Sequence, residues 1–157
     1  MNLTDKVSEI QTQVARARDQ HFQLVWLAGA SSRRRSDLLR TLADAENGIF
    51  LELGKKLSSL LIEVPVPLRP ASVEECFTDC LSASPDRLTC LDYLDILFEP
   101  SLRINPVSLV KGASRHTSIV ASWPGKVSKD GLCFGPPDHP AHFLISEREL
   151  ESAIFIL

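Results

Sequence analysis

The sequence predicts a three-layer α/β fold, with helices on both faces of a mostly parallel sheet of about five strands. Short apolar runs alternate with amphipathic segments along the 157 residues. The runs are apolar at nearly every position, as is typical of strands buried on both faces. Such alternation indicates βαβ units with right-handed crossovers. The length fits one domain, so we expect residues 1–157 to form a single unit.

The expected elements follow one another without a linker or an internal repeat. An amphipathic helix is expected within residues 1–20, because Leu3, Val7, Ile10 and Val14 repeat at helical spacing. Further helices are expected at 36–45, 55–63, 73–81 and 106–114, and strands at 22–29, 49–53, 87–91 and 117–123. The C-terminal segment 126–157 is expected to hold a hairpin around Gly131, a short helix near 147–152 and an apolar tail.

Composition excludes several classes of protein. The chain is 44% hydrophobic and 24% charged, as in an ordinary globular protein, and its net charge of −3 argues against a domain-wide nucleic-acid binder. It contains no apolar run near the ~20 residues that span a bilayer, and its first residues lack the apolar core of a secretory signal. We therefore expect a cytoplasmic protein without a membrane anchor, with its four cysteines as thiols.

Ligands of open parallel sheets bind beyond the carboxyl ends of the strands. In this sequence the expected strand ends carry polar residues at Gly29–Ser36, Asp92–Asp95 and Ser122–Gly125. The sequence therefore predicts that these three segments meet at one edge of the sheet and form the functional site.

The first of these segments resembles a phosphate-binding loop, which reads G-x-x-x-x-G-K-[S/T] between a strand and a helix. Residues 29–36 read GASSRRRS, so the first glycine and the last hydroxyl remain, while Arg34 and Arg35 replace the second glycine and the lysine. Loop amides, the helix dipole and three guanidinium groups favour a bound anion. The candidate nucleotide-binding residues are Gly29, Ser32, Arg33, Arg34, Arg35 and Ser36. Alternatively, the arginines form a solvated start of a helix.

An aspartate at the end of the strand at 87–91 indicates a magnesium site. In P-loop NTPases a carboxylate at this point holds Mg²⁺ together with the loop hydroxyl, so Ser36 and Asp92 are the candidate metal residues. Asp95 shares one side with Asp92 if a helical turn begins there, and it is the candidate catalytic residue that orients water. Tyr93 stands where the hydrolytic branch has a glutamate. Alternatively, both aspartates serve as acids at a helix start.

Two further residues are candidate sensors of a γ-phosphate. Ser122 ends the strand at 117–123, which is expected to lie beside the strand of the loop. Arg115 precedes that strand and could contact a phosphate in trans. The alternative for this region is a plain turn in which Trp123 packs in the core.

Three segments carry a family resemblance: LVWLAGASSRRRSDLLRTLA, CLDYLDILFEPSLRINPVSLVKGASRHTSIVASWPG and GPPDHPAHF. In order and spacing they resemble BrxF, the small P-loop proteins of bacteriophage-exclusion (BREX) defence systems. The resemblance implies a P-loop NTPase-like fold and a cytoplasmic protein that acts with other BREX proteins: a methyltransferase, a phosphatase-like protein and a large ATPase. It implies a nucleotide site at Gly29, Arg35 and Ser36, with Asp92 on magnesium. The family's loop is intact, whereas this chain departs from it at Arg34 and Arg35.

Three functions follow as hypotheses. The first is a nucleotide-binding or degenerate NTPase subunit that binds ATP or ADP with Mg²⁺, either self-assembled as a homo-oligomer or joined to BREX partners. The second is a non-catalytic adaptor in which the fold persists as a scaffold. The third is a weak or indirect DNA association through the Arg33–Arg35 cluster and Arg40, which would weaken steeply with salt. An open cradle of N–H groups at residues 31–36 would favour the first function. A loop collapsed onto Asp92, with Arg35 salt-bridged to that aspartate, would favour the second.

Overall fold

The computed structural model describes residues 2–81 and 86–157 and has the expected α/β layers. Five parallel strands form the main sheet in the order β2-β3-β4-β1-β8. Their bounds are β1 Leu24–Ala28, β2 Ile49–Glu52, β3 Thr89–Asp92, β4 Ile119–Ser122 and β8 Ala153–Ile156. The buried run at β1 and its position beside β4 were both predicted.

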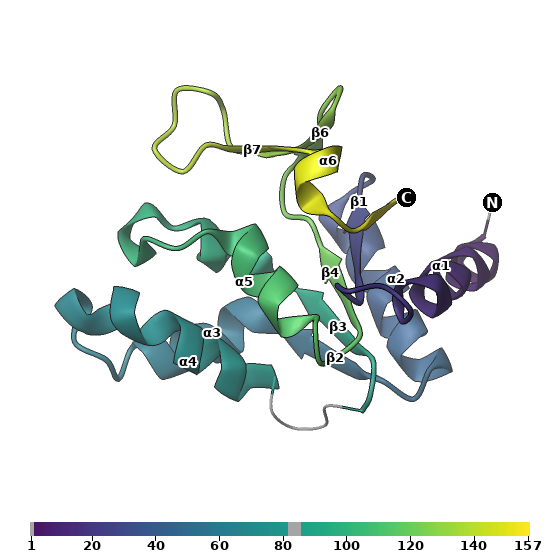
Figure 1. Cartoon of the computed structure of the whole chain (residues 1–157), viewed down its shortest axis with the longest axis horizontal. Helices are drawn as coiled ribbons and strands as arrows, with labels where there is room; N and C mark the ends of the chain where they lie inside the picture. Colours follow the sequence, from purple (N-terminus) through teal and green to yellow (C-terminus); the bar gives the residue numbers. More distant parts are fainter. Residues whose placement is uncertain (1, 82–85) are drawn as a thin grey trace.

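Helices cover both faces of this sheet (Figure 1). One face carries α1 (Leu3–Ala17) and α2 (Ser32–Ala45). The other carries α3 (Leu53–Leu61), α4 (Arg69–Leu81) and α5 (Pro106–Ala113). Each face has its own apolar cluster, because successive strand residues point to opposite sides.

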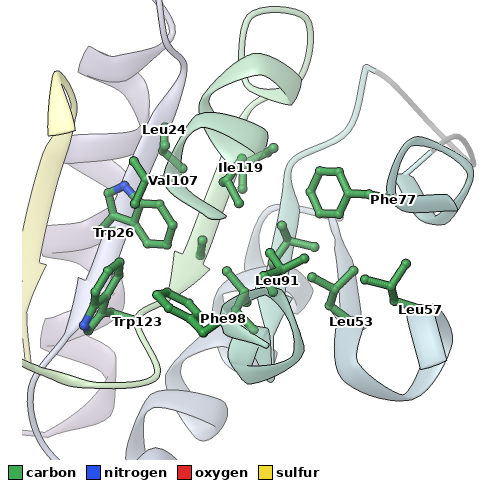
Figure 2. Close-up of a cluster of buried hydrophobic side chains, with 14 of the residues drawn as sticks. Leu24, Trp26, Leu53, Leu57, Phe77, Leu91, Phe98, Val107, Ile119 and Trp123 are labelled. Carbon is green, nitrogen blue, oxygen red and sulfur yellow. The ribbon is translucent and has the colours of Figure 1, made fainter. Parts of the chain in front are cut away.

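Three aromatic rings pack together in the cluster under α3, α4 and α5. The ring of Trp123 lies 5.3 Å from those of Trp26 and Phe98, with edge-to-face geometry in both pairs. Figure 2 shows these rings between the strands and the helices of that face. The indole N–H of Trp123 donates to the Cys133 carbonyl at 2.9 Å, so its one polar atom is satisfied. The sequence alternative of a packed indole at Trp123 therefore holds.

Three helices begin earlier than expected, and the start expected for α3 at residue 55 is wrong because that helix begins at Leu53. The start expected for α2 at residue 36 is wrong, because Ser31 caps a helix that begins at Ser32: its Oγ accepts the Arg34 N–H at 3.2 Å. The start expected for α4 at residue 73 is also wrong. Ser72 lies inside the helix, where its hydroxyl donates to the Leu68 carbonyl at 3.0 Å. Short 3₁₀ turns lie at η1 (Val66–Leu68), η2 (Leu94–Phe98) and η3 (Pro100–Leu102).

The C-terminal segment extends the expected hairpin into a small antiparallel sheet. Its strands are β5 (Lys126–Val127), β6 (Gly131–Phe134) and β7 (Phe143–Ser146). Helix α6 (Glu147–Leu150) follows with a capping box made by Ser146 and Glu149. The tail that the sequence left without secondary structure is strand β8, paired with β1.

Across the described ranges 2–81 and 86–157, no helix combines the length and apolar character that a membrane span requires. In the same residues no group of three or more His, Cys, Asp or Glu side chains is arranged to hold a metal ion. The four cysteines are free, and burial raises the pKa of the Cys90 thiol to about 12.

Candidate functional site

The three predicted strand ends meet at one edge of the sheet. Because β3, β4 and β1 are neighbours, the residues that follow them lie side by side. The Ser36 hydroxyl donates to the Asp92 carboxylate, and the Arg35 Nε donates to the Ser122 hydroxyl at 2.9 Å. Two hydrogen bonds thus join the start of α2 to the ends of β3 and β4.

The connection between β1 and α2 is short. It consists of Gly29, Ala30 and Ser31, and the first two have positive φ angles of 84° and 49°. Glycine is required at position 29 by this conformation and by crowding, since an added Cβ would lie 2.9 Å from the Leu157 carbonyl oxygen. The segment therefore turns sharply into the helix, and Ser32, Arg33 and Arg34 belong to the first helical turn rather than to a loop.

The side chain of Arg35 folds back over this turn. It is 6% exposed, and its NH1 donates to the carbonyls of Gly29 at 2.9 Å and Ala30 at 3.2 Å. The Arg35–Asp92 salt bridge expected for a filled loop is wrong. The partners of the planar guanidinium are two carbonyls and the Ser122 hydroxyl. Burial lowers the pKa of Arg35, and the nearby carboxylates of Asp92 and Asp95 oppose that shift.

Asp92 is held from two sides. It is 4% exposed, one carboxylate oxygen accepts the Ser36 hydroxyl, and the other accepts the backbone N–H of Tyr93 at 2.9 Å. Tyr93 adopts a left-handed conformation with φ of 58°. The helical turn considered for residues 92–95 begins only at Leu94, and Asp95 is exposed while Asp92 is buried.

The remaining predicted residues divide between the two edges of the sheet. Ser32, Arg33 and Arg34 are exposed at the start of α2. Arg115 follows α5 and precedes β4, so it lies at the amino edge of the sheet, opposite the loop. Within one chain it does not join Ser122 or Arg35, and a contact made by Arg115 with this site would come from another copy, as the sequence hypothesis required.

The residues fit a magnesium nucleotide only in part. Ser36 and Asp92 are adjacent, as a hydroxyl and a carboxylate that share Mg²⁺ must be. The phosphate cradle, however, needs several N–H groups that face the ligand. Here the Arg34 N–H is bound by the Ser31 hydroxyl, the Arg35 N–H by the Ser31 carbonyl at 3.1 Å, and the Arg35 guanidinium covers the turn. In this conformation the loop does not fit a triphosphate.

The sequence did not predict that the C-terminal residues would contact this site. The backbone after β8 lies against the turn: the Leu157 N–H donates to the Ala28 carbonyl at 2.8 Å. The five-residue apolar tail is a weak strand signal by itself, because such runs are ambiguous between strand and helix. Its pairing with β1 depends on contacts distant in sequence.

Comparison with known proteins provides no relative for this chain. A scan against protein-family models, a search of curated proteins and a search of solved structures each found no match. The function is therefore argued from the site itself.

Proposed function

We propose that this chain is a nucleotide-independent adaptor subunit of a prokaryotic phage-defence complex of the BREX kind. One observation carries the proposal: the Arg35 guanidinium is hydrogen-bonded to the Gly29 and Ala30 carbonyls and to the Ser122 hydroxyl. The defence context comes from the sequence resemblance, which implies a methyltransferase, a phosphatase-like protein and a large ATPase as partners.

The energetics of Arg35 support an adaptor over an enzyme. To contact a phosphate, the guanidinium would leave three partners, and each hydrogen bond to a charged group contributes about 1.5–3 kcal/mol. Helix α2 would also have to unwind its first turn, in which the Ser31 cap holds the Arg34 N–H. Both changes oppose nucleotide binding. Neither is needed if these residues serve only to join α2 to β3 and β4.

A second candidate function is nucleotide binding without efficient hydrolysis. The observation that favours it is the contact between Ser36 and Asp92, the pair that would hold Mg²⁺. In that function Arg33 and Arg34, which are exposed, would approach the phosphates after Arg35 had moved. Asp95, which is also exposed, would be the residue that orients water.

Calorimetric titration with MgATP and MgADP separates the two candidates. For the wild-type protein we expect no binding heat up to about 1 mM nucleotide. Displacing Arg35 would cost more free energy than weak phosphate contacts would provide. The matched variant restores the loop by Arg34→Gly and Arg35→Lys, and any binding that it gains measures what the two arginines prevent. Arg33→Ala serves as the control for removal of an exposed arginine.

Wild-type binding at about 1–10 µM that is lost in Asp92→Ala would overturn the adaptor and establish the nucleotide-binding candidate. Circular dichroism of each variant should accompany the titration. It verifies that a loss of binding is not caused by unfolding of the variant.

A further inference from the structure

Strand β2 presents an open backbone edge. In the sheet that the described residues form, β2 is an edge strand paired with β3. The Ile49 N–H donates to the Leu88 carbonyl at 2.8 Å, on the β3 side. Because neighbouring residues of a strand direct their backbone groups to opposite sides, Phe50 and Glu52 direct theirs outward. Two N–H groups and the Phe50 carbonyl therefore face away from the sheet.

A groove of about 530 Å³ follows this edge. It is shallow and open to solvent, and residues of α2, β2 and α3 line it. The lining residues are Arg40 of α2, Phe50, Leu51 and Glu52 of β2, and Lys55, Lys56, Ser59 and Leu60 of α3. The groove thus combines an apolar base with an unpaired strand edge.

The charges around the groove are mainly positive. Arg40, Lys55 and Lys56 are exposed cations, and Glu52 is the one acidic residue of the lining. Arg40 lies 3.3 Å from the Glu52 carboxylate and stacks over the Phe50 ring at 4.3 Å. This stacking holds one cation on the α2 side of the edge. Lys55 supplies a second on the α3 side, where the Lys56 ammonium donates to the Cys80 carbonyl at 3.4 Å.

We propose that the β2 edge binds an extended acidic segment of a partner protein, which adds a strand to the sheet. The outward N–H and C=O groups supply the main-chain hydrogen bonds of strand addition. Side chains of an added strand alternate between the two faces, so adjacent acidic residues would meet Arg40 on one face and Lys55 or Lys56 on the other. This inference rests on the proposed adaptor function, because it names the surface through which the adaptor would bind a partner.

Charge disfavours one alternative occupant, and the strand backbone distinguishes the acidic segment from another. A second copy of the chain would bring the same three cations to the groove, and like charges in contact disfavour pairing. Duplex DNA would use the cations but not the outward N–H groups of the strand, and it would bind with a steep dependence on salt. Peptide binding and DNA binding are therefore distinguished by whether loss of an outward backbone N–H of β2 weakens binding.

The backbone requirement is tested by a pair of variants at Glu52. Its φ of −79° suits proline, and its N–H faces away from the sheet, so Glu52→Pro removes the donor while leaving the ladder to β3 intact. Glu52→Gln is the matched control, since it removes the same carboxylate and keeps the N–H. Circular dichroism verifies that both variants fold.

The probe is a displayed random library of peptides of roughly twelve residues, selected on wild-type protein; selected peptides are then measured by fluorescence anisotropy. We expect enriched peptides to carry adjacent acidic residues among β-branched ones. We expect binding about tenfold weaker to Glu52→Pro and undiminished to Glu52→Gln. Charge reversal by Lys55→Glu with Lys56→Glu should also weaken binding about tenfold, which provides a test if the proline variant does not fold.

The proposal is overturned if the library yields no binder, if selected peptides lack acidic residues, or if they bind Glu52→Pro as well as wild type. Salt-sensitive binding of a duplex oligonucleotide in place of the peptides would likewise overturn it. Nucleotide titration is measured separately, so nucleotide binding by the wild type would remove the adaptor function without altering the result at β2.

Discussion

Trp123→Ala is expected to lower the free energy of unfolding by about 3–5 kcal/mol, the usual cost of removing a large buried aromatic side chain. Trp123 is fully buried and packs edge-to-face on Trp26 and Phe98. Its truncation would leave a cavity between the sheet and the small C-terminal sheet. It would also leave the Cys133 carbonyl without the indole N–H that it accepts.

Urea denaturation followed by circular dichroism measures this change. Ile62→Ala is the control, because Ile62 is 71% exposed and a surface substitution should alter the free energy of unfolding by less than about 0.5 kcal/mol. A loss below about 1 kcal/mol for Trp123→Ala would contradict the packing described for this part of the core.

Arg35→Ala is expected to lower the free energy of unfolding by about 2–3 kcal/mol, which is less than the sum of its three hydrogen bonds because the substitution also removes the cost of burying the charge. The substitution leaves the Ser122 hydroxyl and two backbone carbonyls without their donor, and it removes a cation near the buried Asp92. An arginine whose side chain stayed in solvent until a phosphate bound would contribute little to the free energy of unfolding. The expected loss is therefore a direct consequence of the structural role.

The controls for Arg35 differ in exposure and in shape. Arg34→Ala removes an exposed arginine of the same helix turn and should alter the free energy of unfolding by less than about 0.5 kcal/mol. Arg35→Lys keeps the charge but not the planar fork, so it should recover only part of the loss. Equal stabilities for Arg35→Ala and the wild type, by denaturant titration, would refute the structural role of Arg35.

Much of the site was predictable because it depends on strand ends. Apolar runs at β1, β3 and β4 could be recognised in the sequence, and parallel strands necessarily bring their carboxyl ends to one edge. The proximity of Ser36 to Asp92 and of the loop to Ser122 follows from that geometry. The conformation of the residues between them does not.

The features that could not be predicted depend on which local conformation residues 29–36 adopt and on contacts between residues distant in the sequence. The motif at residues 29–36 favoured an open loop, whereas the cap at Ser31 extends α2 by a full turn and buries Arg35. No local pattern distinguishes these outcomes, because both are compatible with a strand, a glycine and a helix. Strand β8 and the groove along β2 involve residues brought together by the sheet order, which single-sequence periodicity does not give.

The central claim is that the Arg35 guanidinium is bonded within the protein rather than free to meet a phosphate. Nuclear magnetic resonance tests it through the Nε–H signals of the arginine side chains, with Arg35→Lys used to assign the signal of Arg35. We expect the Arg35 Nε–H to exchange with water far more slowly than those of Arg33 and Arg34, because Ser122 accepts it in a buried site. We also expect its chemical shift to stay constant when MgATP is added. Exchange as fast as that of the exposed arginines, or a shift that saturates with MgATP, would contradict the account.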